Sequence, residues 1–201
     1  MDLQRKAIPL MPLAIVMTQG ERRLIDVEQK AYVQLLDELR SSDRPNIFGI
    51  PFADQGVLSA NGSLVKLVPS EEKTANPSAI RVECVGHFQA LSYAQALWPK
   101  PYPGGNVREI DALLERPIDD ELKAIASRVI QLLGEGGLNM SRLSYANTAD
   151  IMRWLGMPAA QKHQLLISRG RKRRGHLMAL LQWAHTVLRQ EVEIKNGFFP
   201  N

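Results

Sequence analysis

Few side chains in this sequence are of the types that bind metals or act as nucleophiles, and they are scattered. The chain has one cysteine, Cys84, and four histidines, at positions 87, 163, 176 and 185. His176 and His185 share the last predicted helix, but nine residues at 100° each place them on opposite faces, so they cannot chelate one metal. Cys84 alternates with Ile80 and Val82 along a predicted strand, which favours a buried core thiol over a nucleophile. We therefore expect structural roles for these side chains and no metal site.

Catalytic motifs are missing as well. No Gly-x-Ser-x-Gly, His-Glu-x-x-His or Cys-x-x-Cys pattern occurs in the sequence. Gly170 and Gly175 have the spacing of a phosphate-binding loop, but His176 and Leu177 stand where that loop needs Lys and then Ser or Thr. The cation for the phosphates and the hydroxyl for magnesium are both lacking there. We therefore predict no catalytic residues, no cofactor and no enzymatic activity.

Five cations crowd into six residues, and we name them the basic cluster: Arg169, Arg171, Lys172, Arg173 and Arg174. They make the charge uneven, since residues 1–117 hold 13 basic and 14 acidic side chains, whereas residues 118–201 hold 12 and 7. Most of the cluster begins the last predicted helix, where the helix dipole disfavours cations by ~0.3–1 kcal/mol each. Ion pairs with the chain's own carboxylates, an acidic partner or nucleic acid would each offset this cost. The cluster is thus the candidate contact for an anionic partner.

Aromatic side chains mark a second candidate surface. Trp98 lies in the Pro- and Gly-rich residues 96–105, close to Tyr102. Exposed aromatics held by prolines would suit contact with an extended peptide, whereas the alternative is a loop pinned onto the sheet. We take Trp98 and Tyr102 as candidate peptide contacts. Trp154 and Trp183 fall on predicted helices, where we expect them to be packing residues.

The hydrophobic pattern of the first half predicts strands separated by turns. Strands are expected over residues 8–16, 22–27, 46–51, 57–60, 63–68, 79–91 and 107–113, and an irregular loop over residues 99–105. Asn61-Gly62 suits the two positive-φ positions of a type I′ turn, which predicts a hairpin there. Residues 28–40 instead carry apolar side chains at helical spacing, which predicts one helix.

The second half predicts helices over residues 119–133, 148–155, 158–167 and 172–194. Asn147 suits the N-cap of the second of these, and Gly156 follows its end. The predicted fold class is therefore α+β, with a β-rich unit over residues 1–117 and a helical unit over residues 118–201. No run of 18 apolar residues occurs, so no membrane-spanning helix is expected and the cytoplasm is the expected compartment.

The order of several short motifs adds to this reading of the residues. They are Ile8-Pro9-Leu10-Met11-Pro12-Leu13 with Gly20 and Leu24, Ile47-Phe48-Gly49-Ile50, residues 56–68, Val85-Gly86-His87-Phe88, and the Pro158-led helix of residues 157–166. In this order they resemble the N-terminal, substrate-binding domain of Lon proteases. His87 stands where that family has an arginine before the phenylalanine, which is a departure.

The resemblance implies a PUA-like six-stranded pseudo-β-barrel that carries one helix, followed by a helical bundle that ends in a long helix. Lon proteases continue with ATPase and Ser–Lys peptidase parts, whereas this sequence ends at Asn201 after the long helix and has no ATP-binding motif. We therefore expect a stand-alone relative without catalysis.

The function expected from the resemblance is recognition of unfolded or apolar polypeptide segments, or of a protein partner. The pseudo-barrel surface or the cleft between barrel and bundle would provide the site. The alternative is an RNA-binding PUA-like module that uses residues 169–174 to neutralise phosphates. Binding of RNA would depend steeply on salt, and binding of an apolar peptide would not, so the two expectations are separable by experiment.

Overall fold

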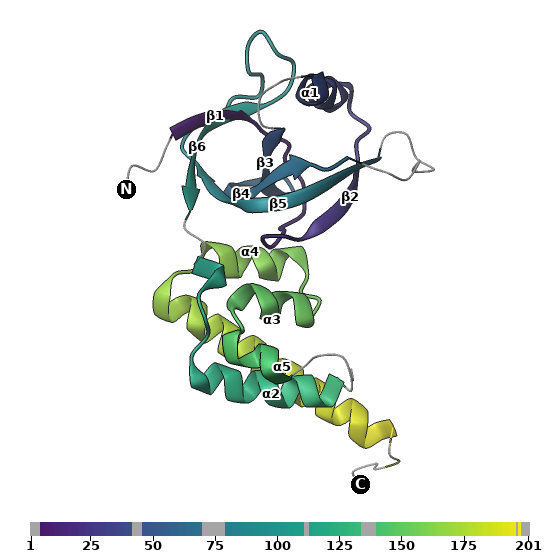
Figure 1. The fold of residues 1–201 in the computed structure, drawn as a ribbon, viewed down its shortest axis with the longest axis vertical. Helices are drawn as coiled ribbons and strands as arrows, with labels where there is room; N and C mark the ends of the chain where they lie inside the picture. Colours follow the sequence, from purple (N-terminus) through teal and green to yellow (C-terminus); the bar gives the residue numbers. More distant parts are fainter. Residues whose placement is uncertain are drawn as a thin grey trace. The chain divides into compact units, whose positions relative to one another are not determined.

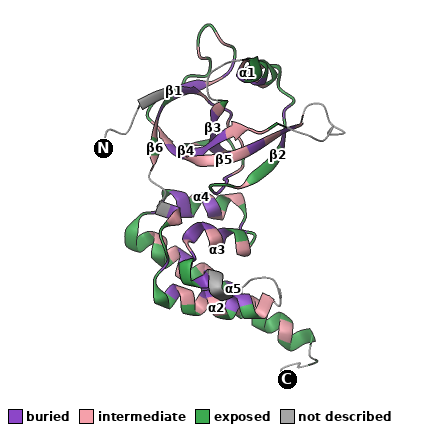
Figure 2. Ribbon diagram, viewed as in Figure 1, coloured by how far each residue is buried: buried purple, intermediate pink, exposed green. Residues whose placement is uncertain are grey.

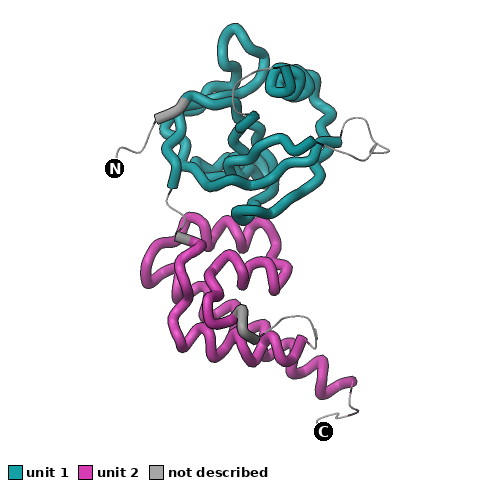
Figure 3. Tube along the Cα trace, in the orientation of Figure 1, with its two compact units in different colours: residues 1–112 teal, residues 113–201 magenta. Residues whose placement is uncertain are grey.

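The structure is a computed structural model, and it describes residues 5–41, 46–69, 79–110, 113–133, 140–195 and 197. The chain divides into two compact units, unit 1 over residues 1–112 and unit 2 over residues 113–201 (Figure 3). Unit 1 holds the strands and one helix, and unit 2 holds the remaining helices (Figure 1). The α+β fold class predicted from the sequence is therefore confirmed.

Unit 1 is a curled, six-stranded antiparallel half-barrel. Its elements are β1 (Arg5–Pro9), β2 (Arg22–Asp26), α1 (Lys30–Ser41), β3 (Ile47–Asp54), β4 (Val57–Leu67), β5 (Ala79–Ala90) and β6 (Gly104–Ile110). The strands follow the order β1-β6-β5-β4-β3, and β2 pairs with β5. The segment after β1 turns back to β3, where the Met11 N–H donates to the Gly49 carbonyl at 2.8 Å. This contact links the two ends of the sheet and explains its curl.

The hairpin predicted at Asn61-Gly62 is wrong, because β4 runs through both residues without a break. The turn lies at Gln55 and Gly56, whose φ angles of 48° and 78° are the positive values that a tight hairpin needs. Gly62 has a different role. A Cβ placed on it would lie 2.1 Å from the Ile50 carbonyl oxygen, so the close approach of β3 to β4 requires a glycine there.

Two further boundaries differ from the sequence prediction. Gly104 and Gly105, expected in an irregular loop, begin β6, and a Cβ on Gly105 would meet the Ser92 carbonyl oxygen at 2.0 Å. The strand expected over residues 8–16 ends at Pro9, and the chain beyond it makes only isolated bridges to β3. Proline lacks the N–H that a continuing ladder needs, which accounts for this early end. Residues 111 and 112, near the end of the predicted strand 107–113, lie outside the described residues.

The core of unit 1 confirms the alternation seen in β5. Ile80, Val82 and Cys84 are buried on its inner face, and the Cys84 thiol is a core group as predicted. Helix α1 covers this core with Leu35 and Leu36, which are buried on its inner stripe. Burial of apolar surface at roughly 25 cal/mol per Å² is what holds the helix on the sheet.

In its described residues, unit 2 consists of short turns and four α-helices. Its elements are η1 (Leu113–Glu115), α2 (Asp120–Leu133), η2 (Met140–Tyr145), α3 (Thr148–Trp154), α4 (Ala159–Ile167) and α5 (Gly170–Lys195). Asn147 caps α3 as predicted, since its Oδ1 accepts the Asp150 N–H at 2.9 Å and Asp150 accepts the Asn147 N–H in return. Helices α2 and α5 lie side by side (Figure 1). None of the described helices combines the length and hydrophobicity that crossing a bilayer requires.

Candidate functional site

An apolar groove opens in unit 2 along α5. Its volume is about 310 Å³, the lower end of the range for ligand pockets. Of the lining residues that the structure describes, only Gln161 is polar. The lining residues are Leu133 of α2, Trp154 of α3, Leu155 and Met157 after it, Pro158 and Gln161 at the start of α4, and Leu180, Trp183, Ala184, Val187 and Leu188 of α5.

Local chain geometry shapes the walls of this groove. Helix α3 ends at Trp154, and Gly156 then takes a φ of 55°, which turns the chain into α4 within a few residues. The predicted helix over residues 158–167 places Pro158 in its first turn. In the structure α4 begins one residue later, and Pro158 is its N-cap residue. The short α3–α4 connection therefore forms one wall, and the side of α5 that includes Trp183 forms the other.

Trp183 is not a packing residue, contrary to the sequence prediction, because 64% of its surface is exposed. Leu180 and Val187 beside it are half-buried. Figure 2 shows that exposed and half-buried residues dominate the last part of α5. A signal for this surface exists in the sequence, since residues 180, 183 and 187 form an apolar stripe beside the stripe that packs in the core. Helix α5 is thus apolar over a wider arc than its neighbours cover.

The structure divides the basic cluster by the contacts its members make. Arg174 lies beside the start of α2, where its Nε donates to Asp119 Oδ2 at 2.6 Å and its Nη2 donates to Glu121. These hydrogen bonds lower the pKa of Asp119 and raise that of Arg174. The chain's own carboxylates therefore offset this cation, one of the outcomes considered from the sequence.

Arg173 serves a different purpose. Its Nε donates to the Leu165 carbonyl at 2.9 Å and its Nη2 to the Leu166 carbonyl at 3.4 Å, near the end of α4. Cations are favoured at that end of a helix because its carbonyls lack partners. Burial lowers the pKa of Arg173, and the nearby guanidinium groups of Arg169 and Arg116 lower it further. Arg173 is therefore a structural cation in a locally positive environment.

The other three members of the basic cluster face solvent. Arg169, Arg171 and Lys172 are exposed. Within the part of the chain that the structure describes, none of their side chains makes an ion pair or a hydrogen bond. These three cations are the ones available to an anionic partner, which stays a prediction.

The loop between β5 and β6 separates the two aromatic candidates. Trp98 is 90% exposed, whereas Tyr102 is 4% exposed and packs with the core of unit 1. The Tyr102 hydroxyl donates to Glu38 Oε2 at 2.8 Å, and Lys100 Nζ donates to the same oxygen at 2.6 Å. The loop is thus pinned onto α1, and Tyr102 anchors it from inside. Trp98 as a peptide contact stays a prediction.

This anchor is expected to weaken in acid. The hydrogen bonds from Lys100 and Tyr102 lower the pKa of Glu38 below its usual 4.5, while burial and Glu38 raise the pKa of Tyr102 to about 12. A depressed carboxyl pKa stabilises the fold above the unfolded-state value, and this contribution is lost as pH falls through the folded value. Anisotropy of Trp98 fluorescence, measured with Trp154 and Trp183 changed to Phe, should therefore drop in that acidic range. Glu38→Gln should remove this pH step, and an unchanged step in that variant would contradict the assignment.

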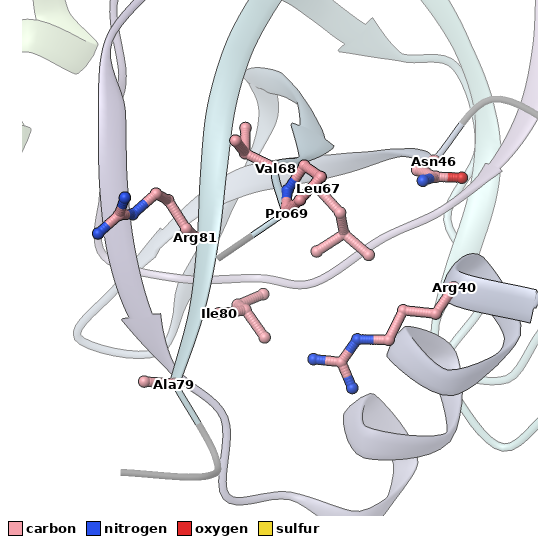
Figure 4. Close-up of a pocket in the computed structure, with 8 residues that line it drawn as sticks. All are labelled: Arg40, Asn46, Leu67, Val68, Pro69, Ala79, Ile80 and Arg81. Atoms are coloured by element: carbon pink, nitrogen blue, oxygen red, sulfur yellow. The ribbon is translucent and has the colours of Figure 1, made fainter. Parts of the chain in front are cut away.

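A second hollow of about 290 Å³ lies in unit 1, between α1 and the strands β4 and β5 (Figure 4). Arg40 points toward Ile80 on its floor, whereas Arg81 extends away from it, so the two guanidinium groups do not converge on one ligand (Figure 4). Its lining residues include Asn46, Pro69 and Ala79, which stand at the edges of described ranges. This hollow therefore carries no functional assignment.

Two histidines have structural contacts, as expected. His87 is buried, and its Nε2 lies 2.9 Å from the Met17 carbonyl oxygen. His176 Nδ1 lies 3.1 Å from Ser168 Oγ, at the junction of α4 and α5. Over the described ranges, no three His, Cys, Asp or Glu side chains gather closely enough to hold a metal ion.

Comparison with known proteins bears on the fold. No protein-family model matches this sequence, and no curated protein matches it either. A solved structure of a Lon N-terminal domain protein from Xanthomonas campestris matches with a TM-score of 0.64 at 19% identity, covering 89% of this chain and 98% of that one. This chain therefore has the fold of a Lon N-terminal domain. The N-terminal domain of Mycobacterium avium complex Lon protease matches equally well, with a TM-score of 0.63, 19% identity and the same coverage of 89% and 98%.

The Lon N-terminal fold confirms the resemblance that the order of motifs suggested. At 19% identity the likeness concerns the path of the backbone. Both units take part, because the match covers 89% of the chain.

Proposed function

We propose that this chain is a non-catalytic protein-binding module, which takes apolar polypeptide segments into the groove of unit 2. The observation that carries the proposal is the open apolar groove, with its exposed Trp183 and half-buried Leu180 and Val187. Its likeness to Lon N-terminal domains supports the same class of function, because the resemblance implies recognition of polypeptide substrates.

The groove has the chemistry that such recognition needs. Covering apolar surface is favourable by roughly 25 cal/mol per Å², and the groove offers this surface on the side chains of both its walls. Tryptophan is among the residues that most often dominate binding energy, since its large flat ring buries much area with little loss of conformational freedom. Gln161 can hydrogen-bond to a peptide backbone at the edge of the groove.

The test compares two exposed tryptophans. Trp183→Ala should weaken binding of a fluorescein-labelled, unstructured, Leu-rich peptide by about tenfold or more, the loss typical of a central aromatic contact. Its circular dichroism and melting temperature should stay close to those of the parent chain, because Trp183 is largely exposed. Fluorescence anisotropy of the labelled peptide gives the affinity.

Trp98→Ala is the matched control, since it removes an even more exposed tryptophan from unit 1. It should leave peptide affinity unchanged. Loss of binding in Trp98→Ala with none in Trp183→Ala would move the site to the β5–β6 loop and overturn the groove. Absence of peptide binding by the parent chain would overturn the proposed function as a whole.

A further inference from the structure

The groove and the exposed cations of the basic cluster belong to the same unit, and two of these cations, Arg171 and Lys172, lie on α5, which also lines the groove. Lys172 and Trp183 are both exposed on α5 and stand 11 residues apart. Eleven residues make three helical turns, so the two side chains leave α5 on nearly the same side, about 17 Å apart along its axis. Arg171 lies about 100° around the helix from Lys172, away from the groove side. An occupant of the groove that extends toward the start of α5 therefore meets Lys172.

Charge is distributed unevenly along this side of the molecule. Among the described residues that line the groove, none is charged. The first turns of α5 hold four cations and no carboxylate, whereas its last turns hold two cations, Arg189 and Lys195, and two carboxylates, Glu191 and Glu193. The positive end of the α5 dipole coincides with the cationic end. Arg169 adds a further exposed charge directly before the helix.

Three carboxylates of unit 2 already have cationic partners. Asp119 and Glu121 both pair with Arg174. Asp150 pairs with Arg153 and accepts the backbone N–H of Asn147, the N-cap of α3. Lys172 and Arg169 therefore keep their charge available to a partner, among the residues that the structure describes.

We propose that the polypeptide segment bound in the groove is acidic at the end that faces the start of α5, where its carboxylates pair with Lys172 and Arg169. This inference rests on the proposed function and names the class of segment: a few apolar residues followed by Asp or Glu. Burial of apolar surface provides most of the binding free energy. The cations make acidic segments bind more tightly than other apolar segments and set the orientation of the bound segment in the groove. Exposed ion pairs are individually weak, so the selection is a modest factor that salt removes.

The experiment uses the full chain and labelled peptides with one Leu-rich segment. The segment carries three Asp, three Ser or three Lys at one end, and each version is made with the charges at either end. One of the two Asp peptides places its Asp residues at the end that faces the start of α5. This peptide should bind about three- to tenfold more tightly than the matching Ser peptide at low salt. The Lys peptide should bind more weakly than both. High salt should bring the three affinities together.

Two variants locate the effect. Lys172→Gln combined with Arg169→Gln should abolish the preference for the Asp peptide without weakening the Ser peptide. Arg171→Gln removes one exposed cation on the other side of α5 and should keep the preference. Loss of the preference in Arg171→Gln alone would overturn the assignment to the groove side.

The remaining outcomes separate this inference from the function on which it rests. Equal affinity for the three peptides would overturn the acidic selectivity and leave the groove intact. Absence of binding to every peptide would overturn both. An oligouridylate that binds in place of the peptides, with a log–log salt slope of roughly −0.7 per phosphate, would show that these cations serve RNA instead.

Discussion

Replacing Gly62 by alanine is expected to lower the free energy of unfolding by about 3 kcal/mol or more, an unusually large effect for a single methyl group. The added Cβ would lie 2.1 Å from the Ile50 carbonyl oxygen and 2.6 Å from the Pro51 Cα. Both are backbone atoms of the paired strand β3, so no side chain can rotate out of the way. Relief requires β3 and β4 to separate, which breaks the pairing between them.

Gly86→Ala is the matched control for this substitution. Gly86 also lies within a strand, β5, and a Cβ there would come no closer than 4.0 Å to the Leu64 side chain. The loss from Gly86→Ala should stay within about 1 kcal/mol, since added methyls without a clash are tolerated. Urea unfolding followed by circular dichroism measures both values. Similar losses in the two variants would show that β3 and β4 do not approach as closely at Gly62 as described.

The same position shows where local sequence reasoning fails. Asn61-Gly62 has the chemistry of a hairpin turn, and Gln55-Gly56 carries a weaker version of that signal. The turn forms at Gln55-Gly56 because β3 and β4 then pair along most of their length. Glycine is needed at position 62 for close packing against Pro51, a neighbour that is remote in sequence. Turn propensity alone does not distinguish these two uses of glycine.

Regular patterns were the part of the fold that the sequence predicted well. Alternation in β5 placed Ile80, Val82 and Cys84 on the inner face, where they are buried. Helical spacing predicted each of the helices α1 to α5 within a few residues. The curl of the sheet was accessible only through the resemblance to Lon domains, because it depends on the pairing of the segment after β1 with β3.

The basic cluster shows why the sequence could not sort the candidate site residues. All five cations are alike in type and adjacent in sequence. Arg173 becomes structural because α4 ends beside it, and Arg174 is neutralised because α2 begins beside it. Tyr102 is likewise removed from the surface by its hydrogen bond to Glu38 on α1. Each outcome depends on where another helix lies, which short-range spacing does not encode.

Leu180 and Leu181 offer the sharpest comparison within unit 2, since they are chemically identical and adjacent on α5. Both belong to the apolar spacing of the helix, which gives no reason to rank them. Leu181 is 1% exposed and lines the same small gap as Val129 and Ile151. Leu180 is half-buried and lines the groove.

Leu181→Ala is therefore expected to destabilise unit 2 by about 2–5 kcal/mol, the range for truncating a buried leucine, because it leaves a cavity between α2, α3 and α5. Leu180→Ala should destabilise it by less than about 1 kcal/mol, since part of that side chain already faces solvent. Urea unfolding measures both losses. The effects on peptide affinity should have the opposite order. Leu180→Ala should weaken binding of the Leu-rich peptide more than Leu181→Ala does, at a temperature where both variants are folded.

This crossed pattern separates a binding surface from a part of the core. If Leu180 were simply a peripheral core residue, its truncation would lower stability and affinity together, and always by less than truncation of Leu181. An alanine variant of an apolar residue that keeps its stability but loses affinity is instead the result expected where apolar surface is held open for a partner. Equal losses of stability in the two variants would mean that the α3–α4 connection closes over Leu180, and the groove would then have to be abandoned as the binding site.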